Sequence, residues 1–474
     1  MSAASVLAET KPAIEKLFSE QRAAFAAQPF PDGRERRKNL TLLLNALRSR
    51  REELAAAIDA DFGGRSRYEV LFSEIYVAAN ALRHARRHVK DWMQPRRRPV
   101  GWPLQPAQAS VLPQPLGVVG IIVPWNYPVF LAISPLAGAL AAGNRAMLKP
   151  SEHTPRTSEA LAKLIADTFP PDLVTVVTGD SSVGRAFTRL PFDHLLFTGS
   201  TAVGREVMRA AAENLTPVTL ELGGKSPAIV APDANLRRAA ADIAYGKLLN
   251  AGQTCIAPDY VLLPKDSLED LITALRHAVQ EYYPDGAGDP GYTAVINATH
   301  YQRLQGYIDE ARQRGVRTIV LGGEAAGGGG RKLAPTLLVD PPDDLAVMRD
   351  EIFGPVLPLK TYHVIEDAID YVNQRPRPLA LYLFTRSDKV TDLVLRQTVA
   401  GGVCINDTLM HIAGEDLPFG GVGASGMGHY HGREGFDTFS KLKPVFRRRW
   451  PGLGRTLRPP YTRLHDWMAR FLIG

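Results

Sequence analysis

The spacing of apolar residues predicts helices over the first ninety residues. Leu40, Leu43, Leu44 and Leu47 recur at i, i+3, i+4 and i+7, the intervals that place side chains on one face of a helix. Later stretches of this region, rich in alanine and arginine, follow a similar pattern. A proline-rich, basic stretch from Pro95 to Pro115 then interrupts it. We expect that stretch to be extended, because proline cannot donate a backbone hydrogen bond inside a helix.

Short apolar runs then alternate with helix-like segments. The first such series predicts strands at 118–123, 146–149, 174–177 and 195–197. The pattern starts again after Pro217 with strand-like runs at 218–221 and 228–230, and it continues to about Ile405. Strand–helix alternation at this spacing predicts parallel α/β sheets, here in two successive domains.

Length and composition agree with two domains. A chain of 474 residues is too long for one core, and 45% hydrophobic with 22% charged residues is ordinary for a globular protein. Cys255 and Cys404 are the only cysteines, too few for a disulfide scaffold or a cysteine-rich zinc site, so no metal is expected. Neither a secretory signal nor a membrane-spanning apolar run is visible, which makes a reducing cytoplasm the default expectation.

Cys255 is the first candidate for chemistry. It follows Gly252, Gln253 and Thr254, small and polar neighbours that suit a thiol approached closely by a ligand. The alternative is a buried cysteine that acts as a small apolar side chain, as most free cysteines do. A nucleophilic cysteine also needs a base and a group that stabilises an oxyanion, and these must come from elsewhere in the chain.

Two other residues could supply those functions. Glu221 lies between leucines at a strand end, before Gly223 and Gly224, where partial desolvation would raise its pKa towards that of a general base. The alternative is a surface carboxylate paired with Lys225. Asn126 lies between two prolines after a buried strand, so its amide could help form an oxyanion hole or could simply satisfy the turn backbone.

Candidate cofactor contacts follow the predicted strands. Glu152 comes after the second strand, where acidic residues accept hydrogen bonds from ribose hydroxyls in dinucleotide folds. The turn 198–204 opens a helix whose first amides suit a diphosphate, although it lacks the usual G-x-G-x-x-G pattern. Glu351 and Phe353 lie in a Glu-Ile-Phe-Gly-Pro segment that could equally be an ordinary turn with a core phenylalanine.

Six short motifs together resemble the aldehyde dehydrogenase superfamily over about residues 10–445. They are Pro124-Trp125-Asn126, Lys149-Pro150-Ser151-Glu152, Phe197-Thr198-Gly199-Ser200, Glu221-Leu222-Gly223-Gly224-Lys225, Gly252-Gln253-Thr254-Cys255 and Glu351-Ile352-Phe353-Gly354-Pro355. The segments 253–260 and 417–426 are similar to the class 3 branch, and within it to the coniferyl aldehyde dehydrogenases of bacteria.

The resemblance implies a mechanism. Cys255 would attack the aldehyde carbon, and the Asn126 amide with the Cys255 backbone N–H would hold the oxyanion. Glu221 would activate the water that hydrolyses the thioester. The aldehyde would be aromatic, such as coniferaldehyde, or a medium- or long-chain aliphatic one. The cofactor would be NAD, with NADP possible, and the residues implied to bind it are Trp125, Lys149, Glu152, Gly199, Ser200, Gly204, Glu351 and Phe353.

The resemblance also implies an architecture and a homodimer. It predicts a Rossmann-like cofactor domain at 1–91 and 113–221, an α/β catalytic domain at 222–435 and a small β bridging element at 92–112 and 436–447. Two other functions on this fold remain open. One is a dehydrogenase that transfers the acyl group to coenzyme A, against which Glu221 argues. The other is a non-catalytic binding protein.

The basic tail at 448–474 needs a separate explanation. The chain carries a net charge of +7, and seven arginines with one aspartate from Phe446 onwards account for +6 of it. Apolar and charged residues of the tail fall on opposite helical faces, which suits a helix on anionic lipid or one packed over its own subunit or its dimer mate. We favour packing on protein. No nucleic-acid-binding motif accompanies the arginines.

Overall fold

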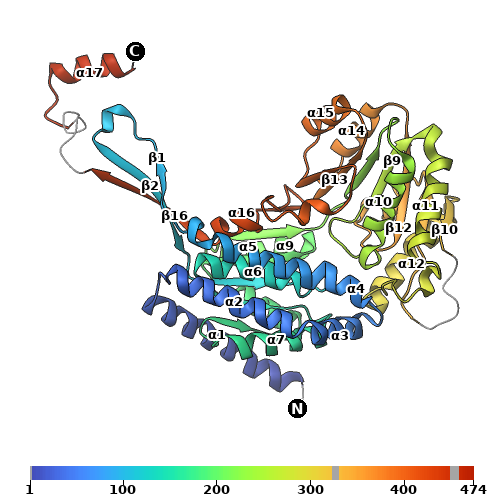
Figure 1. Ribbon diagram of the computed structural model, residues 1–474, viewed down its shortest axis with the longest axis horizontal. Helices are drawn as coiled ribbons and strands as arrows, with labels where there is room; N and C mark the ends of the chain where they lie inside the picture. The colour runs from blue at the N-terminus through green and yellow to red at the C-terminus, as the bar shows by residue number, and fades with distance from the viewer. Residues whose placement is uncertain (1–2, 323–329, 449–457, 474) are drawn as a thin grey trace.

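The computed structural model describes residues 3–322, 330–448 and 458–473. It contains three β-sheets, two of them covered by helices and the third projecting as an arm (Figure 1). The helices expected before residue 92 are present. They are α1 (Ala3–Ala27), α2 (Gly33–Ser49), α3 (Arg51–Phe62), α4 (Arg67–Val70), a π-helical turn (Leu71–Tyr76) and α5 (Val77–Trp92).

The first sheet has six strands in the order β15-β7-β6-β3-β4-β5. Its strands are β3 (Val118–Ile122), β4 (Arg145–Lys149), β5 (Val174–Val176), β6 (His194–Gly199), β7 (Val218–Leu222) and β15 (Gly426–Met427). All pair in parallel except β15, which pairs antiparallel with β7. The parallel sheet predicted from the alternating pattern is therefore confirmed.

Both faces of this sheet are buried, as parallel sheets require. Val119 and Ile121 of β3 pack with α2, α5, α6 (Phe130–Ala142) and α7 (Pro155–Thr168) on one face. Val118 of the same strand packs with α1, α8 (Ser181–Thr188) and α9 (Thr201–Ala212) on the other. Successive side chains of a strand point to opposite faces, so a continuous apolar run supplies both layers.

The second sheet has seven strands in the order β10-β11-β12-β9-β8-β13-β14. They are β8 (Pro227–Val230), β9 (Tyr260–Pro264), β10 (Arg317–Val320), β11 (Thr336–Val339), β12 (Val356–Tyr362), β13 (Ala380–Phe384) and β14 (Gly402–Ile405); only β10 is antiparallel to its neighbour. The remaining helices of this part are α10 (Leu236–Leu248), α11 (Leu268–Tyr282), α12 (Ala298–Gln313), α13 (Ala346–Arg349), α14 (Ile365–Asn373) and α15 (Asp388–Gln397).

The third sheet is an antiparallel arm of β1 (Arg96–Arg98), β2 (Ala107–Pro115) and β16 (Ser440–Arg448). Its strands come from the two segments expected to form a bridge, but the expectation was wrong in one detail. Phe436 lies in helix α16 (Gly432–Thr438), fully buried against α5 and α6, so the strand begins only at Ser440. An apolar ring is held by the main core more favourably than by a thin, exposed arm.

The division at 222–435 remains a prediction, and the pairing of β15 bears on it. Gly426 is paired with Glu221, so this strand belongs to the six-stranded sheet although the expected boundary assigns it to the catalytic domain. Beyond the arm lies α17 (Arg463–Ile473), which has no buried residue (Figure 1). Among the described residues, no helix is long and apolar enough to cross a membrane.

Candidate active site

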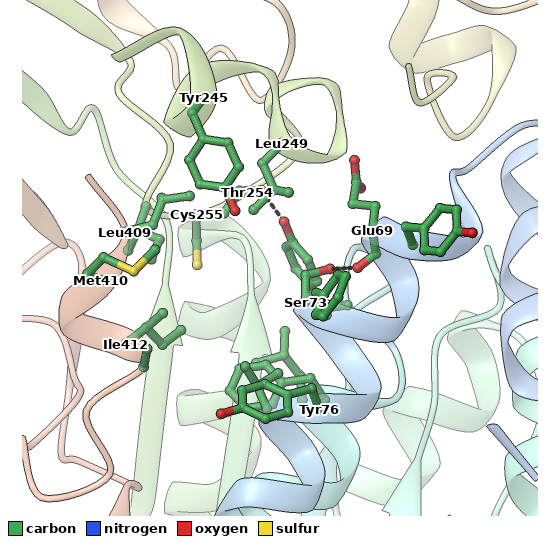
Figure 2. Close-up of a pocket in the computed structure, with 18 of the residues that line it drawn as sticks. Glu69, Ser73, Tyr76, Tyr245, Leu249, Thr254, Cys255, Leu409, Met410 and Ile412 are labelled. Atoms are coloured by element: carbon green, nitrogen blue, oxygen red, sulfur yellow. Dashed lines mark hydrogen bonds between the residues drawn. The ribbon is translucent and has the colours of Figure 1, made fainter. Parts of the chain in front are cut away.

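Cys255 lines a cavity of about 570 Å³ (Figure 2). Aromatic side chains from four helical elements and two loops form much of its wall, and Leu409, Met410 and Ile412 close another side. The aromatic residues are Tyr68, Phe72, Tyr76, Tyr127, Phe130, Tyr245 and Tyr283. A concave apolar space with one nucleophile and few polar groups is the usual form of a small-molecule site.

A strained turn presents Cys255 to this cavity. Asn250, Ala251 and Gly252 have φ values of 53°, 51° and 76°, three successive left-handed residues between the end of α10 and the thiol. Gly252 also passes so close to Gly354 that a Cβ would lie 2.4 Å from its carbonyl oxygen. The buried side chain of Gln253 ties the turn to the next loop by donating to the Ala294 carbonyl at 3.0 Å and accepting from Ile296 N at 2.9 Å. Such backbone persists only where its surroundings hold it.

The surroundings of Cys255 keep it a thiol at rest. Burial, together with the carboxyl groups of Glu351 and Glu221, raises the pKa of Cys255 to about 12. The backbone amides of Cys255 and Ile256 act in the opposite direction, because they donate towards the sulfur and favour its anion. The free protein therefore holds a protected nucleophile beside two donors that can also face a developing oxyanion.

Glu221 is a buried carboxyl without a partner. It ends β7 with 3% of its surface exposed, and neither side-chain oxygen has a hydrogen-bond partner among the described residues. Burial alone raises its pKa well above the usual value for glutamate. The surface ion pair with Lys225 that the sequence left open is not formed, since Lys225 instead pairs with Asp259. A desolvated carboxylate close to Cys255 suits general-base chemistry.

Asn126 is held rigidly beside the cysteine loop. Its side-chain nitrogen donates to the Gln253 carbonyl at 3.1 Å, which uses one of the two amide hydrogens. Its backbone oxygen accepts from Asn250 Nδ2 at 3.0 Å and from Arg65 Nη1 at 2.9 Å. The second amide hydrogen remains for an oxyanion formed at the thiol.

A second cavity, of about 680 Å³, lies at the carboxyl ends of β3, β4 and β6. It is lined by five of the residues that the sequence singled out as cofactor contacts: Trp125, Lys149, Glu152, Gly199 and Ser200. Lys149 is 3% exposed and lies 3.9 Å from the Glu152 carboxylate. Ser200 caps α9, and Ser200 and Val203 at the start of this helix line the groove, where helix amides suit a phosphate group.

Gly204 does not line this groove. A Cβ on Gly204 would lie 2.6 Å from Leu222 Cδ2, so its lack of a side chain allows α9 to pack closely on β7. The expected contact between Gly204 and the cofactor therefore remains a prediction, and the structure adds a packing role for this glycine. His153 and His300 do line the groove, with the His300 ring 5.2 Å from Trp125, and no sequence pattern had marked either of them.

Phe353 contacts a residue of the groove, and Glu351 is close enough to Cys255 to raise its pKa. The Phe353 ring packs edge-on at 5.3 Å against Trp125, with φ at a left-handed value of 49°. Glu351 is half-buried, one of its carboxyl oxygens is buried without a hydrogen-bond partner among the described residues, and desolvation beside Asp259 raises its pKa to about 8. A Cβ on Gly223 would lie 2.0 Å from Glu351, so this glycine is required for the close approach.

These features fit a nicotinamide dinucleotide. Ser200 and the α9 N-terminus offer donors for a diphosphate, Glu152 offers an acceptor for ribose, and the unpartnered Glu351 oxygen offers another near the cysteine. In the ranges 3–322, 330–448 and 458–473, no three His, Cys, Asp or Glu side chains are grouped so as to hold a metal ion.

Comparison with known proteins agrees with this geometry. The family model described as "Aldehyde dehydrogenase family" matches residues 2–445. The chain is 54% identical over 448 residues to the "Probable coniferyl aldehyde dehydrogenase" of Pseudomonas aeruginosa, covering 94% of each chain. It is 50% identical over 415 residues to the "Coniferyl aldehyde dehydrogenase" of a Pseudomonas species, covering 87% of this chain and 86% of that one.

Solved structures match equally broadly. A substrate-bound state of Staphylococcus aureus AldH superposes with a TM-score of 0.91 at 39% identity, over 97% of this chain and 99% of that one. An NAD+ complex of a Bacillus cereus aldehyde dehydrogenase superposes with a TM-score of 0.85 at 29% identity, over 93% and 90%. The resemblance drawn from six motifs is confirmed: this chain belongs to the aldehyde dehydrogenase family and is an NAD(P)-dependent enzyme that oxidises aldehydes.

Proposed function

We propose that this enzyme oxidises aromatic aldehydes of the coniferaldehyde type to carboxylates, with Cys255 as the nucleophile. The observation that carries the proposal is the cavity at Cys255, whose walls are largely tyrosine and phenylalanine rings. Flat aromatic substrates gain offset or edge-on contacts with such rings beyond the gain from burial alone. The names of the two Pseudomonas relatives point to the same substrate class.

In the first step, Cys255 sulfur bonds to the aldehyde carbon and the thiol proton passes to a base. The carbonyl oxygen becomes an alkoxide, which the Asn126 amide and the Cys255 backbone N–H hold by hydrogen bonds. These donors are already oriented by the loop, so stabilising the new charge requires no rearrangement. Bound NAD(P) supplies the acceptor for the hydride that leaves the same carbon, and the substrate remains attached to Cys255 as a thioester.

In the second step, Glu221 accepts a proton from water, whose oxygen then attacks the thioester carbon. The carbon–sulfur bond breaks, the carboxylate leaves and the sulfur regains a proton. The raised pKa of Glu221 makes the ionised group a stronger base than an exposed glutamate. Water attack through Glu221 also argues against transfer of the acyl group to coenzyme A.

The cofactor would be held by residues of the groove and of the adjoining loop. Lys149 and Glu152 are assigned to the adenosine ribose, Gly199 and Ser200 to the diphosphate, Glu351 to the nicotinamide ribose, and Trp125 and Phe353 to packing near that ring. The carboxylate of Glu152 disfavours a 2′-phosphate, so we assign NAD as the preferred cofactor, with NADP as the second choice. Gly204 is assigned to helix packing.

The test compares NADH formation with coniferaldehyde, benzaldehyde, hexanal and decanal, in the parent enzyme and in Cys255→Ala. Coniferaldehyde should give the highest kcat/KM, and Cys255→Ala should show no turnover. Cys404→Ala is the matched control, because the other cysteine is buried against His411 and should be dispensable for the chemistry. A higher kcat/KM for decanal would move the assignment to aliphatic aldehydes, and normal turnover by Cys255→Ala would overturn the mechanism.

For the assembly, we propose a cytoplasmic homodimer in which the arm and α17 contact a second copy. Leu464, Trp467 and Phe471 of α17 are 53%, 62% and 65% exposed, and the ring of Trp102 in the arm lies 6.1 Å from that of Phe471. A helix with this much uncovered apolar surface needs a partner. A second copy accounts for it without invoking an anionic membrane, which is the less favoured occupant.

A further inference from the structure

Arg65 forms a buried ionic cluster with two glutamates. Its Nη1 donates to Glu74 Oε1 at 2.9 Å and its Nε donates to Glu69 Oε1 at 3.2 Å, and no side chain of the three is more than 7% exposed. The guanidinium also lies over the ring of Tyr127, 4.8 Å from its centroid. Glu69 of this cluster also lines the cavity at Cys255 (Figure 2).

The cluster holds the loop that carries Asn126 from both sides. Arg65 Nη1 also donates to the Asn126 backbone oxygen at 2.9 Å. Glu74 Oε2 accepts from the backbone amides of Val129 and Phe130 at 2.7 and 3.1 Å, at the start of α6. A carboxylate at that place satisfies helix amides that would otherwise lack partners. The loop between these two attachments has little freedom to move.

The same loop holds the cysteine turn. The Asn126 oxygen that accepts from Arg65 also accepts from Asn250 Nδ2, and the Asn126 side chain donates to the Gln253 carbonyl. Tyr127 shares a hydrogen bond of 2.7 Å with Thr254, next to Cys255 (Figure 2). A continuous chain of contacts therefore runs from the ionic cluster to both groups assigned to the first chemical step.

Stability alone gives no reason for such a cluster. Buried ions lose their hydration, and a well-packed apolar set of the same volume serves folding as well or better. The cluster can, however, fix the direction of the Asn126 carbonyl and of the α6 amides, which apolar side chains cannot. We propose that Arg65 is a positioning residue that, through Asn126, holds the oxyanion donor and the Cys255 turn in register. This inference rests on the roles proposed for Asn126 and Cys255.

The first measurement compares Arg65→Lys with the parent enzyme. A lysine keeps the charge but cannot present the planar set of N–H groups that reaches Glu69, Glu74 and the Asn126 carbonyl together. We expect kcat to fall about 10- to 100-fold, the order of loss that a small misplacement of reacting groups causes, with KM for NAD unchanged. The matched control is Arg67→Lys, an exposed arginine two residues away paired with Glu52, which should keep the parent kcat.

The decisive measurement is a double-mutant cycle with Asn126→Ala. Loss of an oxyanion donor should by itself lower kcat about 100- to 1,000-fold. If Arg65 acts through Asn126, adding Arg65→Lys to Asn126→Ala should lower kcat by less than threefold more. If the fold-losses in kcat of the two single variants instead multiply in the double variant, Arg65 has only a general structural role and the inference is overturned.

A second variant covers the case in which Arg65→Lys does not fold. Glu74→Gln retains an acceptor for the α6 amides while weakening the hold on Arg65, and it should show the same lack of additivity with Asn126→Ala. Thermal unfolding of each variant separates stability from rate. Parent-level turnover by Asn126→Ala would overturn the proposed role of Asn126 itself. If Asn126→Ala is slow but Arg65→Lys or Glu74→Gln keeps the parent kcat, only the inference about Arg65 is overturned.

Discussion

At the scale of single residues, the site is marked by buried groups that lack the partners buried groups normally have. Glu221 and Glu351 both have unpartnered oxygens among the described residues, and both have raised pKa values. A buried polar group left unsatisfied destabilises the folded state, typically by about 1–3 kcal/mol. The proposed chemistry would supply the missing partners, namely water for Glu221 and a ribose hydroxyl for Glu351.

Glu221→Gln should separate the two chemical steps. An amide cannot accept the proton of the attacking water, so steady-state turnover should fall about 100- to 10,000-fold. Cys255 is still present, so one equivalent of NADH should form in a rapid burst and acyl-enzyme should accumulate. Stopped-flow absorbance measures the burst and intact mass spectrometry measures the adduct. Loss of the burst together with turnover would instead assign Glu221 to activation of the thiol.

The reactivity of Cys255 in the free enzyme should depend on Glu351. With its pKa raised to about 12, the thiol is protonated throughout the neutral range, so alkylation by iodoacetamide should be slow there and accelerate as pH rises. Glu351 has a pKa of about 8, and above that pH its negative charge opposes the thiolate. Glu351→Gln should therefore speed alkylation above pH 8 and change little at pH 6.

The comparison for that experiment is Glu366→Gln, an exposed carboxylate in α14. Its alkylation profile should overlay that of the parent enzyme. A Glu351→Gln profile that also overlays the parent would show that the carboxylate does not control the thiol.

At the scale of elements, close packing of helix α9 on strand β7 sets the distance between the groove and the catalytic residues. Gly204 allows α9 to lie on Leu222, and Leu222 follows Glu221 in β7. The helix that caps the groove and the strand that carries the base are therefore packed in direct contact. A change in the separation of these two elements should affect cofactor binding as well as stability.

Gly204→Val should test this contact. The added side chain must displace Leu222, and overpacking of a well-filled core typically costs about 1–3 kcal/mol. We expect a lower Tm and a raised KM for NAD, because α9 is pushed away from β7. Gly306→Ala is the matched control, since Gly306 is also within a helix and a Cβ there meets nothing within 4 Å. An unchanged KM for NAD in a destabilised Gly204→Val enzyme would limit Gly204 to stability.

At the scale of the whole molecule, the arm and α17 expose surface that the rest of the chain does not cover (Figure 1). Besides the helix, the arm presents Trp102 and Phe446, which are 58% and 51% exposed. Exposed apolar surface of this kind suits a second copy of the chain. Because arginines are also numerous in this region, an anionic bilayer is the alternative partner. Binding to a second copy and binding to a bilayer lead to different expected results for the purified enzyme.

We expect the full chain to be a dimer by light scattering and not to float with vesicles containing anionic lipid, because in the proposed dimer the second copy would cover the apolar face of α17. Deletion of residues 449–474 should weaken the dimer, which would appear as a concentration-dependent fall in mass. Flotation of the full chain that is lost on deletion would reverse the assignment and make α17 a membrane-binding helix.

The sequence by itself was enough to predict the α/β class, the five parallel strands of the first sheet but not the antiparallel β15, and the family. Apolar runs of three to six residues between helical segments carry that information locally, because strand and helix periods differ. The identity of Cys255, Glu221 and Asn126 as candidates also came from sequence, since each lies in a short motif with distinctive neighbours. The local pattern did not indicate that Gly204 also allows α9 to pack closely on Leu222, because that contact joins two separate elements.

Only the tertiary structure decided the features that depend on contact between segments far apart in the sequence. The cavity walls come from helices near residue 70, from α10 and from residues 409–413, and no local pattern relates these segments. The link from Arg65 to Asn126 spans 61 positions, and that from Asn126 to Gln253 spans 127. Burial and charge proximity, which set the pKa values of Cys255 and Glu351, arise from the same long-range packing. The chemistry of each side chain is therefore local, whereas its protonation state and orientation are properties of the fold.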